Sequence, residues 1–158
     1  MAHSAPDSPG VPFPPPFLFA LGFGGGLLLH RLMPVSSDTG FGFGIIVLAW
    51  ALVLAGALLL GWALWTFFSA RTAIVPNRPA TDLLTRGPYG FSRNPMYVAL
   101  TAMYIGLALW ATVLWPLVLL PGVLTALWLL VIRREEAYLT RAFGVDYMAY
   151  SARVRRWL

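Results

Sequence analysis

Three long stretches of the chain contain no charged residue, and they predict its architecture. The stretches cover residues 8–30, 39–70 and 94–132. A helix needs about 20 apolar residues to cross the hydrocarbon core of a membrane, so each of the first two stretches fits one crossing. As a single helix the third stretch would be about 58 Å long at 1.5 Å per residue, which fits two crossings better than one.

The middle of the third stretch carries the signals of a turn between two helices. Trp110 and Trp115 are typical of a membrane interface, and Pro116 suits the first turn of a new helix. We therefore expect a helical hairpin there. The sequence as a whole predicts an all-α integral membrane bundle of four transmembrane helices, at about residues 17–33, 43–69, 95–111 and 116–133.

The composition also indicates a membrane protein. Of the 158 residues, 59% are apolar and 11% are charged, whereas soluble domains average about 45–50% and about 25%. The absence of cysteine excludes disulfide bonds, thiolate metal ligands and a cysteine nucleophile, and we assign no metal site. Arginine is used to the exclusion of lysine, which favours a GC-rich, prokaryotic coding sequence and hence a prokaryotic plasma membrane.

Arginine sets the predicted orientation. Segment 71–93 holds four arginines against one aspartate, and the tail 133–158 holds six arginines against three carboxylates. The short loop 34–40 holds only Asp38. The positive-inside rule places both arginine-rich segments in the cytoplasm, with the tail as a helical cytoplasmic extension. Four crossings then place both termini on the cytoplasmic side.

Residues 1–16 are rich in proline and lack a basic start, which predicts a disordered leader rather than a signal peptide. A single membrane domain is expected over residues 17–158.

Within this domain, small residues four positions apart should let helices approach closely. These pairs are Gly22 and Gly26, Ala51 and Ala55, and Ala57 and Gly61.

The predicted spans carry no charged residue at their centres, which argues against a proton-coupled transporter. The chemistry should therefore lie in segments 71–97 and 133–158. In the first of these, Asn94 and Pro95 mark a helix start, and Tyr97 lies about one turn inside that helix. From spacing alone, this fits either an anion site or an ordinary capped helix with interfacial anchors.

The second segment contains Glu135 and Glu136 where the fourth span leaves the membrane. Adjacent helical positions point about 100° apart, so one glutamate is expected to face a pocket while the other pairs with Arg133. The alternative is that both glutamates belong to the solvated, charged end of a membrane helix. Gly144 should end this helix, and the basic, aromatic residues 153–157 should lie on an anionic lipid surface rather than bind nucleic acid.

Taken in order, these motifs resemble the isoprenylcysteine carboxyl methyltransferase and phospholipid methyltransferase superfamily over about residues 80–158. The family pattern is Gly-Pro-Tyr, then Arg-His-Pro-x-Tyr, then Glu-Glu before a Phe-Gly-x-x-Tyr tail. The matching residues here are Gly87-Pro88-Tyr89, Arg93-Asn94-Pro95-Met96-Tyr97, Glu135-Glu136 and Phe143-Gly144 with Tyr147.

The resemblance implies a membrane-embedded methyltransferase that uses S-adenosylmethionine and releases S-adenosylhomocysteine. In the family the cofactor lies at the cytosolic end of the last helices, between the two motifs. A glutamate would hold the ammonium of the cofactor, and Arg93 or the helix start would hold its carboxylate. Carried over residue by residue, the cofactor-binding set is Tyr89, Arg93, Asn94, Pro95, Tyr97, Glu135 and Glu136.

Two positions depart from the family pattern. Asn94 replaces the usual histidine and cannot transfer a proton near neutral pH. Arg155 replaces a proline, which leaves the path of the tail open. We assign Arg153 to the reaction as the residue that holds an anionic acceptor or headgroup.

The implied acceptor is a lipophilic carboxylate, amine or thiol, reached from the lipid bilayer. The alternative is a non-catalytic four-span protein that binds lipid or supports assembly. No oligomeric state follows from the sequence.

Overall fold

The computed structural model describes residues 10–11, 13–35, 42–69 and 83–158, and every regular element in these ranges is helical. Most of the expected leader, the loop with Asp38 and residues 70–82 lie outside them. The elements are α1 (Pro16–Leu32), α2 (Phe43–Ser69), the 3₁₀ helix η1 (Gly87–Gly90), α3 (Pro95–Trp110), α4 (Leu114–Leu127), the π-helix η2 (Trp128–Ile132) and α5 (Arg133–Arg153).

The helix positions agree closely with the charge-free stretches. The predicted boundaries 43–69 are those of α2, and residues 111–113 form the predicted turn between α3 and α4. α2 and the continuous helix Leu114–Arg153 are long and apolar enough to cross a membrane, whereas α1 and α3 are apolar but shorter. The all-helical class is thus confirmed for the described residues, and four crossings remain a prediction.

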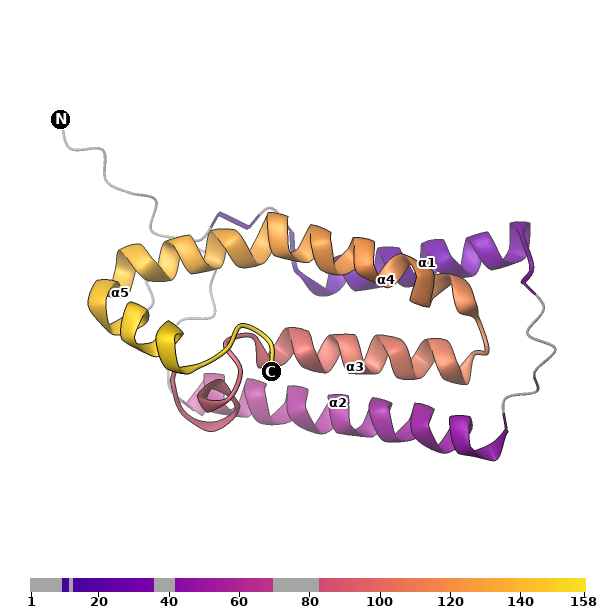
Figure 1. The fold of residues 1–158 in the computed structure, drawn as a ribbon, viewed down its shortest axis with the longest axis horizontal. Coiled ribbons are helices and arrows are strands. Elements are labelled where there is room, and N and C mark those ends of the chain that lie inside the picture. Colours follow the sequence, from indigo (N-terminus) through magenta and orange to yellow (C-terminus); the bar gives the residue numbers. More distant parts are fainter. Residues whose placement is uncertain (1–9, 12, 36–41, 70–82) are drawn as a thin grey trace.

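The helices form two antiparallel pairs, with α2 against α3 and α1 against α4 (Figure 1). The turn between α3 and α4 lies at one end of the bundle. At the other end lie η1, the start of α3, α5 and the C-terminus (Figure 1). We call this second end, formed by residues 83–97 and 133–158, the polar end.

The contact between α2 and α3 depends on small residues. Ala49, Gly56 and Ala63 are buried and lie seven residues apart along α2. A Cβ atom added to Gly56 would lie 2.7 Å from the carbonyl oxygen of Ala99, and one added to Gly106 would lie 2.6 Å from that of Ala49. The backbones therefore approach too closely for larger side chains.

The small-residue prediction is confirmed for α1 and wrong for α2. A Cβ on Gly26 would lie 2.6 Å from the backbone nitrogen of Pro116, and one on Gly22 would clash with Val123. In α2 the predicted residues are exposed. The small residues that face α3 are Ala49, Gly56 and Ala63, which recur every seven residues on another face of the helix. The outward-facing residues are Ala51, Ala55, Ala57 and Gly61.

Two irregularities bring the C-terminal residues back to the bundle. The π-helix η2 changes the helical repeat immediately before α5. Gly144 then adopts φ 49° and ψ −117°, so that the helical path breaks inside α5, where the sequence predicted a helix end. After this break the chain turns back, and its C-terminus lies beside the start of α3 (Figure 1).

Candidate functional site

A hydrogen bond between Tyr97 and Glu135 joins the first turn of α3 to the first turn of α5. The Tyr97 hydroxyl donates to Oε1 of Glu135 over 2.8 Å. Burial raises the pKa of the Glu135 carboxyl, the bond from Tyr97 opposes this rise, and the charge of Glu136 adds to it. The ionised carboxylate therefore has too few stabilising partners in this buried position. A cationic group beside it would be favoured.

The neighbouring Glu136 is held by two arginines from other parts of the chain. Arg156 binds it with two hydrogen bonds, Nε to Oε1 at 2.8 Å and Nη2 to Oε2 at 3.0 Å. Nη1 of Arg93 lies 3.2 Å from the same Oε1. The paired carboxylate in turn raises the pKa of Arg156.

The expected pairing of a glutamate with Arg133 is wrong. The Arg133 guanidinium lies over the ring of Trp128, 5.5 Å from its centroid. Glu135 and Glu136 are instead bonded by side chains from α3, the segment before α3 and the C-terminal tail. Their partners differ because adjacent helical residues point in different directions.

Arg93 is held by three contacts, which involve its backbone N–H and its Nη1. Its backbone N–H donates to the carbonyl oxygen of Arg155 at 2.9 Å, and its Nη1 donates to the hydroxyl of Tyr147 at 3.4 Å. Its Nε is buried and has no hydrogen-bond partner within the described part of the protein. An unsatisfied buried donor is costly, and it marks a position where a ligand acceptor would be stabilised.

Asn94 precedes α3, as predicted, but its side chain does not cap the helix. Its Nδ2 donates instead to the carbonyl oxygen of Arg156 at 2.9 Å, and its backbone N–H donates to Oγ of the buried Ser92. Trp157 packs against the hydrophobic core. The tail, whose path Arg155 left open, therefore runs along residues 93–94.

Tyr89 contacts α5 through its backbone. The Tyr150 hydroxyl donates to the Tyr89 carbonyl oxygen at 2.7 Å, and the rings of Tyr147 and Tyr150 lie 6.2 Å apart. Burial raises the pKa of the Tyr89 phenol and raises that of Tyr150 to about 12. Both phenols are therefore protonated donors at neutral pH.

The structure brings most of the predicted site residues together and leaves one apart. Arg93, Tyr97, Glu135 and Glu136 meet at the polar end, with Asn94 holding the tail and Pro95 buried as the first residue of α3. Arg153 is exposed, and its Nε donates to the carbonyl oxygen of Ala149 at 3.3 Å.

Sequence reasoning missed Arg156, Tyr147 and Tyr150 as members of this site. The spacing of three between the tyrosines, after Gly144, is the signal that places both on one helical face. No such local signal exists for Arg156, because it follows the last helix and reaches Glu136 only through the return of the tail.

The site at the polar end therefore combines the carboxylates of Glu135 and Glu136 with the guanidinium groups of Arg93 and Arg156. This arrangement complements a ligand that carries a cation and an anion close together, such as the ammonium and carboxylate of an α-amino acid. The Glu135 carboxylate fits the cation, and the free Nε of Arg93 fits the anion.

The model of the phospholipid methyltransferase family matches residues 41–146, about two-thirds of the chain. The match includes α2, α3, α4 and both glutamates. No curated protein and no solved structure gives a significant match.

Proposed function

Because the chain belongs to the phospholipid methyltransferase family, we propose that it transfers a methyl group from S-adenosylmethionine to a lipophilic acceptor within a membrane. The acceptor is a carboxylate, amine or thiol that reaches the polar end from the lipid bilayer. Two helices apolar enough to cross a membrane support this setting.

The observation that carries this proposal is the charge pattern at the polar end. The methionine part of the cofactor has an ammonium and a carboxylate on one carbon atom. Glu135 would bind the ammonium, and Arg93 would bind the carboxylate through its free Nε. Charge-assisted hydrogen bonds of this kind are about twice as strong as neutral ones.

When bound, the cofactor would supply a methyl group on a sulfonium, which the acceptor lone pair would attack in line while the C–S bond breaks and the thioether of S-adenosylhomocysteine leaves. Such a reaction depends on proximity and alignment more than on a covalent protein group. Arg93 and Glu135 would fix one end of the cofactor. Tyr97 and Tyr147 hold these two side chains in position.

Arg153 is proposed to hold an anionic acceptor or headgroup. It ends α5 and is exposed, three residues before Arg156. We expect Arg153→Ala to bind cofactor normally and to transfer methyl groups more slowly, and Arg141→Ala, also exposed on α5, serves as its matched control.

We also propose that the bundle crosses the membrane four times with the polar end in the cytoplasm. The excess of arginine at this end supports that orientation. Single cysteines at positions 38 and 141 should be labelled from opposite sides. Labelling of both from the same side would contradict the topology.

The function is tested by ligand binding to the detergent-purified protein. S-adenosylhomocysteine at 100 times its dissociation constant should stabilise the fold by about 2.7 kcal/mol. Methylthioadenosine lacks the amino-acid group and should bind more weakly. A methyl label should then pass from S-adenosylmethionine into a lipid extract. If millimolar S-adenosylhomocysteine has no effect, the non-catalytic membrane protein is the better interpretation.

A further inference from the structure

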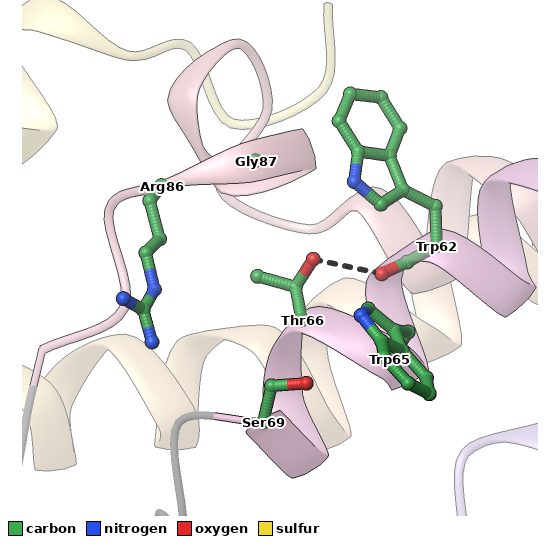
Figure 2. Close-up of a pocket in the computed structure, with 6 residues that line it drawn as sticks. All are labelled: Trp62, Trp65, Thr66, Ser69, Arg86 and Gly87. Atoms are coloured by element: carbon green, nitrogen blue, oxygen red, sulfur yellow. Dashed lines mark hydrogen bonds between the residues drawn. The ribbon is translucent and has the colours of Figure 1, made fainter.

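A second group of polar side chains lines an open hollow between the end of α2 and the turn that leads into η1 (Figure 2). Its volume is about 370 Å³. None of its residues belongs to the glutamate and arginine site described above. The lining residues are Trp62, Trp65, Thr66, Ser69, Arg86 and Gly87.

Among the residues that the structure describes, the lining supplies hydrogen-bond donors and contains no carboxylate. Figure 2 shows the guanidinium of Arg86 beside the hollow, with the indole nitrogens of Trp62 and Trp65 on the sides of their rings that face it. Guanidinium and indole N–H groups can only donate, and the Ser69 hydroxyl provides a further donor. A set of donors like this fits an anion.

The wall of the hollow is fixed by packing. Gly87 has φ 61°, and a Cβ atom on it would lie 3.0 Å from Oγ1 of Thr66 and 3.5 Å from Nε1 of Trp62. The Thr66 hydroxyl donates to the carbonyl oxygen of Trp62 at 2.8 Å, and the Trp62 ring lies 6.1 Å from that of Phe91. Trp62 and the backbone at Gly87 are therefore held in place by packing.

The position of the hollow at the end of α2 indicates which anion it would meet. Trp62 and Trp65 lie near the end of the apolar helix Phe43–Ser69, with half and nearly three-quarters of their surfaces exposed. Exposed tryptophans at a helix end are typical of the level of lipid headgroups. The anion found at that level is the phosphate of a phospholipid.

We propose that this hollow is a phosphate-binding site, in which Arg86 and the indole N–H groups hold the phosphate of a membrane phospholipid. None of these donors belongs to the set of residues proposed to hold the cofactor. The hollow shares only the short helix η1 with the site described above, since Gly87 lines the hollow and Tyr89 accepts the hydrogen bond from Tyr150.

The test is calorimetric titration of the full chain in detergent with short-chain phosphatidylglycerol, and separately with inorganic phosphate. We expect saturable binding of the lipid, weakened about tenfold by Arg86→Gln, which corresponds to the loss of one charge-assisted contact. Trp65→Phe keeps an aromatic ring and removes one donor, so it should weaken binding severalfold. Arg141→Gln removes an exposed arginine elsewhere and should bind as the wild type does.

The two ligands distinguish the sources of phosphate. Binding of the lipid alone supports a headgroup site. Equal binding of inorganic phosphate would show a site for the free anion and would overturn the assignment to a phospholipid. Unchanged affinity in Arg86→Gln would overturn the proposal, as would an equal loss in Arg141→Gln. Stabilisation of Arg86→Gln by S-adenosylhomocysteine should match the wild type, which separates this test from that of the methyltransferase.

Discussion

The side-chain amide of Asn94 donates a hydrogen bond to the carbonyl oxygen of Arg156 over 2.9 Å. The next bond along the chain runs from the Arg93 backbone N–H to the carbonyl oxygen of Arg155 at 2.9 Å. Together they attach the C-terminal tail to the segment before α3. The attachment places the Arg156 guanidinium on Glu136, so that the last residues of the chain complete the candidate site.

Asn94→Ala should lower the free energy of unfolding by about 1 kcal/mol, the usual net contribution of one hydrogen bond. It should also weaken S-adenosylhomocysteine binding, because the tail would keep one backbone bond to this segment and Arg156 would hold Glu136, and through it Arg93, less firmly. Both quantities are measured by thermal unfolding in detergent with and without ligand. Arg155→Ala is the control, since it keeps the backbone carbonyl that Arg93 uses and removes only an exposed side chain. Equal behaviour of the two variants would contradict the role of Asn94.

Gly56→Ala should destabilise the bundle by about 1–3 kcal/mol, the usual cost of overpacking. The added Cβ would lie 2.6 Å from Cγ of Met103 and 2.7 Å from the carbonyl oxygen of Ala99. Unfolding in a denaturing detergent measures the effect. Gly61→Ala is the matched control, because nothing lies within 4 Å of its added Cβ and alanine is the better helix former. A Gly56→Ala variant as stable as Gly61→Ala would mean that α2 and α3 do not pack as described.

The helices were predictable because their signals are local. Charge-free stretches set the extent of α2, Pro95 begins α3, and Pro116 lies in the first turn of α4, which begins at Leu114. The face of α2 that packs against α3 was not predictable from small residues four positions apart, because several faces of α2 carry small residues. Gly56 is identified as a contact residue only once the position of α3 is known.

The candidate site was predictable where it depends on the hairpin and not where it depends on the tail. Two spans of similar length return the chain to the same end, which is why Tyr97 meets Glu135. Arg156 reaches Glu136 through the break at Gly144 and the extended backbone of Val154. No periodic pattern in the sequence encodes that path, and Arg153 is the nearer candidate by sequence alone.

The Glu135→Gln variant should lose ligand affinity, whereas the Glu136→Gln variant should lose stability. Glu135→Gln removes the charge proposed for the cofactor ammonium, so S-adenosylhomocysteine affinity should fall by about 1–3 kcal/mol while methylthioadenosine affinity stays constant. Glu136→Gln leaves Arg93 and Arg156 without their shared partner, so the main loss should be stability without ligand. Calorimetric titration and thermal unfolding separate the two. Loss of affinity for both ligands in Glu135→Gln would argue against contact with the amino-acid group.

The pH dependence follows from the raised pKa of Glu135. The folded protein holds this proton more tightly than the unfolded chain, whose carboxyl titrates near its ordinary value of 4.5. The stabilisation from protonated Glu135 is therefore complete below pH 4.5 and is lost as the pH rises through the folded-state pKa. Glu135→Gln has no such proton, so the unfolding free energy of the wild type should fall relative to this variant over that interval.

Ligand binding should depend on pH in the opposite direction. The ammonium of S-adenosylhomocysteine needs the ionised carboxylate, so wild-type affinity should fall as the pH drops below the folded-state pKa of Glu135. Binding near that pKa should also release a proton, which titrations in buffers of different ionisation enthalpy detect. Methylthioadenosine has no ammonium and should show neither effect. If the pH profile of Glu135→Gln follows that of the wild type, another group controls binding and Glu135 does not hold the ammonium.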